Sequence, residues 1–106
     1  MISQDKIDAL IAKFEKLEAA MAHATKGEEI VRLSREHGEL KPIADKAAAL
    51  TGVRRQIVEL EEIAAGVDRE MSAMAAEELH ALREAELRVE NELQLMLLPK
   101  DKADDS

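Results

Sequence analysis

Apolar residues recur every three or four positions along most of the chain, and no stretch alternates with a period of two. This is the spacing of an amphipathic helix, in which such residues share one face. The first stripe comprises Ile7, Leu10, Ile11, Phe14, Leu17 and Met21. It follows Ser3, whose hydroxyl suits a helix N-cap, and Asp5 falls in the first turn, where a carboxylate is favoured. We therefore predict a first helix over residues 4–23.

A short polar stretch separates this helix from the next. Thr25 and Glu28 have the spacing of a capping box, in which each side chain bonds to the other residue's backbone amide. Gly27 could instead end the first helix. With either reading the turn is tight, so the two helices should lie antiparallel against each other.

The second segment contains a change of phase. One stripe comprises Ile30, Leu33, His37 and Leu40, and a second comprises Ile43, Leu50, Ile57 and Ala64, interleaved with Val53, Leu60 and Val67. The two are displaced by about one residue, and the change falls at Pro42, where a missing amide donor and a crowded ring distort a helix. Because the seven-residue spacing continues through Gly52, we predict one helix over residues 28–65 with a kink near residue 42.

A third helix is expected after Gly66, with Asp68 as its N-cap. Its apolar positions are Met71, Ala75, Leu79, Leu82, Val89, Leu93 and Met96. Pro99 disfavours helical backbone at the residue before it, so the helix should span 69–98 and residues 99–106 should form a linker. Three apolar faces of this kind predict an all-α domain over residues 1–98, an elongated antiparallel three-helix bundle with coiled-coil-like packing.

Composition and charge narrow the function. The chain has no cysteine, no basic start followed by an apolar run, and no apolar stretch long enough to cross a membrane, so we expect a cytoplasmic protein without membrane contact. The net charge of −8 would repel a phosphate backbone. A partner should therefore be a protein surface, or only the edge of an RNA.

No constellation for chemistry is visible. The three histidines are too far apart to form a zinc-binding helix motif, and His80 with Glu84 reads as an exposed polar pair. Paired glutamates on amphipathic helices are usually a solvated face. The methionines Met71, Met74 and Met96 could mark a binding groove, but their helical spacing favours core packing. We predict no catalytic, cofactor-binding or metal site, and no enzyme.

The candidate contact residues are four arginines of the second helix. Arg32, Arg35, Arg54 and Arg55 are the densest positive charge in the chain. They could contact an acidic partner or a few phosphates. The interpretation we favour is that they balance the nearby Glu29, Glu36 and Glu59, since surface ion pairs are weak and common.

Two stretches carry more identity than periodicity requires. They are Leu-Ser-Arg-Glu at 33–36 and Leu-Leu-Pro-Lys-Asp at 97–101, the second at the end of the third helix. With the three-helix layout, they resemble the first domain of bacterial class I peptide chain release factors, of the class reading UAA and UAG. The ending at 97–101 is the more specific of the two.

The resemblance implies a factor that recognises a stop codon in the ribosome and promotes peptidyl-tRNA hydrolysis through a Gly-Gly-Gln loop. Neither that tripeptide nor the codon-reading Pro-x-Thr tripeptide is present, so no such residue carries over. In the family this domain lies toward the large-subunit stalk base and is thought to help with docking and with the recycling GTPase release factor. We therefore expect a monomeric docking module without a small-molecule substrate. The alternative is a standalone helical coiled-coil adaptor or oligomerisation module, motivated by the seven-residue apolar spacing.

Overall fold

The computed structural model describes residues 1–99, which fold into three helices joined by two short turns. The helices are α1 (Gln4–His23), α2 (Gly27–Ala64) and α3 (Arg69–Met96). The sequence placed them at 4–23, 28–65 and 69–98. Residues 1–99 contain no strand, and the predicted all-α fold of three helices is confirmed. The predicted linker at 99–106 lies, apart from its first residue, outside the described part of the chain.

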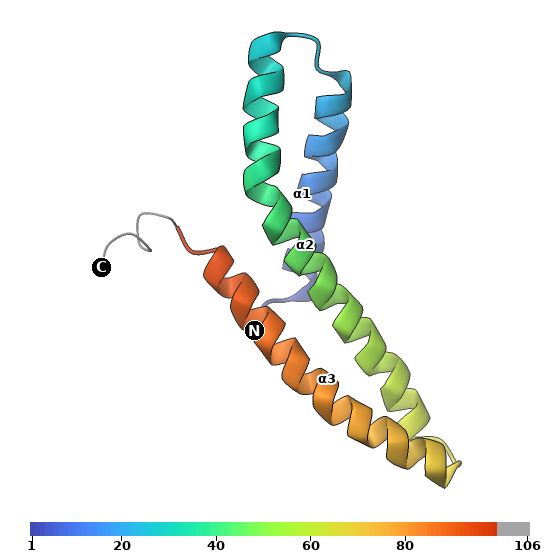
Figure 1. Cartoon of the computed structure of the whole chain (residues 1–106). Helices are drawn as coiled ribbons and strands as arrows, with labels where there is room; N and C mark the ends of the chain where they lie inside the picture. The colour runs from blue at the N-terminus through green and yellow to red at the C-terminus, as the bar shows by residue number, and fades with distance from the viewer. Residues whose placement is uncertain (100–106) are drawn as a thin grey trace.

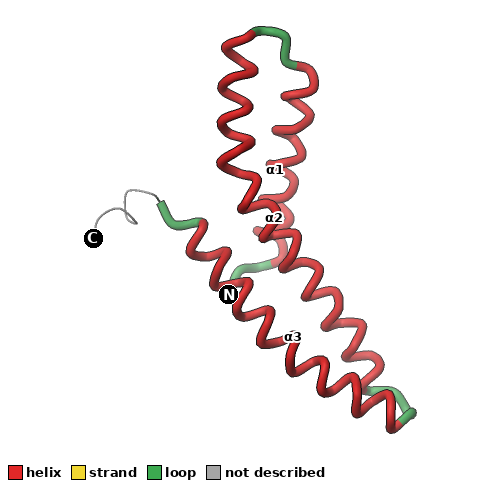
Figure 2. The backbone as a smooth tube through the Cα atoms, in the orientation of Figure 1, coloured by secondary structure: helices red, strands yellow, loops and turns green. Residues whose placement is uncertain are grey.

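α2 is the central element, and the other two helices pack on different halves of it (Figure 1). α1 runs antiparallel along the first half, and α3 runs antiparallel along the second half. The two connecting turns therefore lie at opposite ends of the molecule (Figure 2). The result is elongated, with extents of 61 × 39 × 17 Å. We call the two halves the α1–α2 arm and the α2–α3 arm.

The contacts of α2 with its two partner helices overlap in the middle of the helix. His37 and Thr51 contact α1, through Glu18 and Gln4 respectively. Lys46 and Arg54 contact α3, through Glu92 and Glu86. Contacts with α1 therefore extend past Pro42 to Thr51, and Leu50 of the second stripe shares a core cluster with both Ile7 of α1 and Leu93 of α3. The helix is continuous through Pro42, although its direction changes between the two halves (Figure 1).

All three helices contribute to one core cluster, which lies where the two arms meet. Its buried members are Ile2, Ile7, Ala47, Leu50 and Leu93. Ile11, Ile43, Val89 and Leu97 pack against them, partly buried. Full burial of a Leu or Ile side chain stabilises by roughly 1.5–3 kcal/mol, so this cluster is a large share of the packing energy. Beyond it, each arm is a two-helix pair.

Two of the three expected helix caps form. The Ser3 hydroxyl accepts a hydrogen bond from the Lys6 amide at 3.2 Å, and the Asp68 carboxylate accepts one from the Met71 amide at 3.1 Å. The prediction of a capping box at Thr25 and Glu28 was wrong. α2 begins at Gly27, so the N-cap is Lys26, which makes no side-chain cap bond, and Thr25 lies one residue too early.

Candidate functional site

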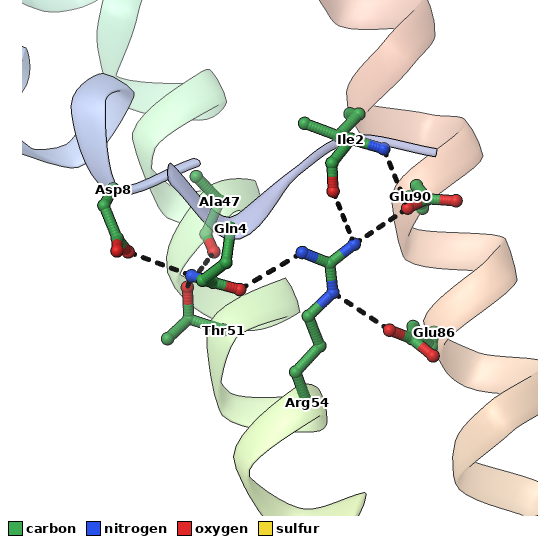
Figure 3. Close-up of polar contacts among 8 residues, drawn as sticks. All are labelled: Ile2, Gln4, Asp8, Ala47, Thr51, Arg54, Glu86 and Glu90. Carbon is green, nitrogen blue, oxygen red and sulfur yellow. Dashed lines mark hydrogen bonds and ion pairs between the residues drawn. The ribbon is translucent and has the colours of Figure 1, made fainter. Parts of the chain in front are cut away.

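The densest polar contacts surround Arg54, which projects from the middle of α2 toward α3 and the N-terminal segment (Figure 3). Its Nε donates to Glu86 at 2.9 Å, and its Nη1 donates to the Gln4 side chain at 3.1 Å. Its Nη2 donates to the Ile2 carbonyl and to Glu90, both at 2.8 Å. The Arg54 guanidinium of α2 therefore bonds to α3, to the first residue of α1 and to the N-terminal segment before it. We call Arg54, Ile2, Gln4, Glu86 and Glu90 the Arg54 network.

Glu90 is the buried acid of this network, with only 4% of its surface exposed. The same carboxylate oxygen accepts from Arg54 and from the Ile2 backbone amide, the latter at 3.1 Å. A buried carboxylate is tolerated only when it is paired and hydrogen-bonded. The backbone of residue 2 is thus held at both polar groups, because its amide donates to Glu90 of α3 and its carbonyl accepts from Arg54 of α2.

A second chain of hydrogen bonds continues from Gln4. Its amide nitrogen donates to Asp8 and to the Thr51 hydroxyl, both at 2.9 Å, and that hydroxyl donates to the Ala47 carbonyl at 3.0 Å (Figure 3). Within residues 1–99, every buried side-chain nitrogen or oxygen has a hydrogen-bond partner. The junction is therefore a satisfied structural network, of the kind that specifies one packing arrangement.

The four arginines predicted as partner contacts divide into two groups. Arg54 is directed inward, with its side chain 19% exposed. Arg32, Arg35 and Arg55 are exposed, and none forms an ion pair with another residue of the described range 1–99. Arg54 pairs with Glu86 and Glu90 of α3, whereas the favoured interpretation assigned the arginines to Glu29, Glu36 and Glu59, and none of these ion pairs forms among residues 1–99. Contact of the other three with a partner remains a prediction.

Sequence reasoning missed the network because it joins positions far apart in the chain. One signal was available. Arg54 lies four residues after Leu50 and three before Ile57, so it is a charge on an apolar stripe. Glu86 and Glu90 are likewise one turn apart on α3, among apolar residues. A charge on each of two facing stripes could have suggested a cross-helix pair, although not its link to Ile2.

The remaining polar candidates form no site for chemistry. His80 and Glu84 make the exposed pair that was predicted, at 3.1 Å. His37 packs its ring against Phe14, with centroids 4.7 Å apart, and contacts Glu18. In the described part of the chain, no three potential metal-ligating side chains come together. Nor does any helix there have the length and apolar character to cross a membrane.

The methionines at the start of α3 depart from expectation. Met71 and Met74 are exposed, at 51% and 63%, so their assignment to core packing was wrong. Both lie next to the turn that closes the α2–α3 arm, where Val67 is fully exposed. Only two helices meet at this end, so no third apolar face covers them.

Comparison with known proteins identifies the family of this chain. The family model described as PCRF domain matches residues 10–106. Peptide chain release factor 1 of Erythrobacter litoralis is 46% identical over 104 residues, 97% of this chain and 29% of that protein. The proteins of the same name from Caulobacter vibrioides and Dinoroseobacter shibae are 42% and 40% identical, over 95% and 98% of this chain and 28% and 29% of their own lengths. The chain thus spans less than a third of these relatives. No solved structure matches it significantly.

Proposed function

This chain belongs to the PCRF domain family, and we propose that it acts as the N-terminal helical domain of a translation termination factor for UAA and UAG stop codons. The observation that carries the proposal is the family match over residues 10–106, with relatives named peptide chain release factor 1 at up to 46% identity. The Leu-Leu-Pro-Lys-Asp stretch at 97–101, which resembles the same family, supports the assignment.

Within such a factor the domain serves docking in the cytoplasm and carries no catalytic or codon-reading residue of its own. Its net charge of −8 disfavours broad contact with RNA and favours protein surfaces as partners. The family resemblance implies that these surfaces belong to the large-subunit stalk base of the ribosome and, during recycling, to the GTPase release factor. The exposed Arg32, Arg35 and Arg55 remain the candidate contacts to acidic groups or to single phosphates at the edge of that site.

A chimeric factor tests this role. Residues 1–99 of this chain replace the matching segment of the Erythrobacter litoralis relative, and peptide release is measured on ribosomes programmed with UAA, UAG or UGA. The chimera should keep the codon preference of the unmodified relative, which its other domains set, and should release peptide at a rate within about threefold of it, or about 0.7 kcal/mol. The relative lacking this segment is the reference for what the domain contributes.

Two results would contradict the proposal. A folded chimera that releases peptide no better than the factor lacking the segment would show that this domain does not substitute for its relative. Equal ribosome binding by the chimera and by the truncated factor would remove the docking role. The exposed Arg35→Ala variant, compared with the wild-type chimera, then tests one predicted contact.

A further inference from the structure

The two flanks of the α2–α3 arm differ. On one flank, Arg83 of α3 donates to Glu61 of α2 at 3.1 Å and bridges the helices. On the other flank lies an open groove of about 450 Å³. Glu61 and Arg83 are each two residues away from the groove residues Ile63 and Ala81, more than half a helical turn around. The ion pair and the groove therefore lie on opposite flanks.

The groove has an apolar floor and acidic edges. Its lining residues are Gln56, Glu59, Leu60 and Ile63 from α2, and Glu78, Ala81 and Leu82 from α3. Leu60 and Leu82 are half-buried and form the floor. Glu59 and Glu78 are exposed on the two helices, and neither pairs with a cation of residues 1–99. Both carboxylates are therefore available to a positively charged ligand.

Apolar surface continues from the groove to the end of the arm. Met74 lies one turn before Glu78 on α3, and Met71 precedes it by three residues, so both extend the row of lining residues. Flexible methionines adapt to varied apolar partners. The same end is strongly acidic, because residues 59–78 contain Arg69 as their only basic side chain against seven acidic ones. These are Glu59, Glu61, Glu62, Asp68, Glu70, Glu77 and Glu78.

We propose that this groove binds a basic amphipathic segment of a partner protein. An apolar side chain of that segment occupies the floor at Leu60 and Leu82, and flanking Lys or Arg side chains pair with Glu59 and Glu78. A phosphate backbone would be repelled by this end of the arm, as would a second copy of the chain, which brings the same acidic residues. The proposal refines the docking role proposed above. It rests on that role only for the expectation that the partner is found in the translation termination assembly.

The test uses a fluorescein-labelled model peptide of Leu and Lys at helical spacing, titrated with the chain and followed by anisotropy. Two variants make a matched pair, because Ala81 and Ala76 are both exposed on α3 but only Ala81 lines the groove. Ala81→Arg places a positive charge and a long side chain in the groove and should weaken binding about tenfold or more. Ala76→Arg makes the same charge change elsewhere and should leave the Kd within about twofold.

Amide NMR spectra of the same titration locate the peptide, with the largest shifts expected at Ile63, Ala81 and their neighbours. Equal weakening by both variants, or shifts centred on the α1–α2 arm, would overturn the proposal. So would tighter binding of a single-stranded RNA or of a Leu and Glu peptide. Peptide binding in the groove with an inactive chimera would leave this inference standing and reject the termination role. An active chimera, combined with no peptide binding by the chain, would support the termination role and reject this inference.

Discussion

The two arms share α2 but differ in how they are closed and in what they expose. The α2–α3 arm is closed at its turn by the Asp68 cap and by the Ser72 hydroxyl, which donates to the Ala64 carbonyl at 2.6 Å. The turn of the α1–α2 arm has no side-chain cap on α2. The α1–α2 arm carries Arg32 and Arg35 near its turn, whereas the α2–α3 arm is acidic with exposed methionines.

This difference shows how one long helix can present two chemically distinct ends. Beyond the junction, each end of α2 lies beside one partner helix, so the surface of each arm is set by a different partner (Figure 1). Only the central cluster and the Arg54 network depend on all three helices. Substitutions at the junction should therefore affect both arms, and substitutions beyond it should affect one.

The largest effect is expected from Arg54→Ala. Removal of the guanidinium leaves Glu90 buried without its cation and frees the N-terminal segment, and breaking such a pair costs about 3–5 kcal/mol. Arg55→Ala is the matched control, since it is exposed and should change stability by less than about 0.5 kcal/mol. Urea unfolding measures both. Equal effects at the two positions would show that the network does not join the arms.

Apolar truncation separates the junction from the arms. Leu50 is fully buried in the central cluster, whereas Leu33 and Leu79 are each 6% exposed in the α1–α2 and α2–α3 arms. Buried Leu→Ala changes cost about 2–5 kcal/mol, and Leu50→Ala should lie toward the upper end. Leu33→Ala and Leu79→Ala should each lower the free energy of unfolding by less than Leu50→Ala does, and by similar amounts. A smaller loss at Leu50 than at either arm position, by thermal or urea unfolding, contradicts a shared central core.

The two turns respond differently to loss of a capping side chain. Asp68→Ala removes the bond to the Met71 amide and should cost about 1 kcal/mol. Thr25→Ala removes no cap bond and should change the free energy of unfolding by less than about 0.5 kcal/mol. Chemical denaturation compares the two variants directly. A loss of about 1 kcal/mol at Thr25 would restore the capping box that the structure lacks.

Glycine replacement gives the smallest effects. Gly38 and Gly52 lie inside α2, one in each half, and an added Cβ would meet nothing within 4 Å at either position. Each change to Ala should stabilise the protein by about 0.5–1 kcal/mol. At Gly66 a Cβ would lie 3.1 Å from the Ile63 carbonyl oxygen, so Gly66→Ala should give no gain. Melting temperatures of the three variants test whether the two halves of α2 behave alike.

Much of this fold could be predicted because the signals are local. The stripe from Ile7 to Met21, the Ser3 cap and the Asp68 cap each depend on residues within a few positions of one another. The exposure of Met71 and Met74 could not be predicted, because helical spacing does not reveal how many other helices pack against a helix at a given point along its length. The phase change near Pro42 was visible, but where α2 passes from α1 to α3 depends on contacts between residues far apart in the chain, such as Gln4 with Thr51 and Lys46 with Glu92.

The Arg54 network was beyond sequence reasoning for the same reason. Its central contact joins Ile2 to Glu90, 88 residues apart. Only the folded chain brings the N-terminal segment beside α3. Similarly, the groove beside Leu60 and Leu82 requires the relative height of α2 and α3, which apolar periodicity does not give.

The central structural claim is that one buried network joins both arms through the N-terminal segment, and the amide of Ile2 tests it most directly. An amide one residue from the chain start normally exchanges with solvent at the rate of an unfolded peptide. Because this one donates to the buried Glu90 carboxylate, hydrogen exchange followed by NMR should show it protected, and Arg54→Ala should abolish that protection while Arg55→Ala should not. An Ile2 amide that exchanges freely in the wild-type protein would contradict the account.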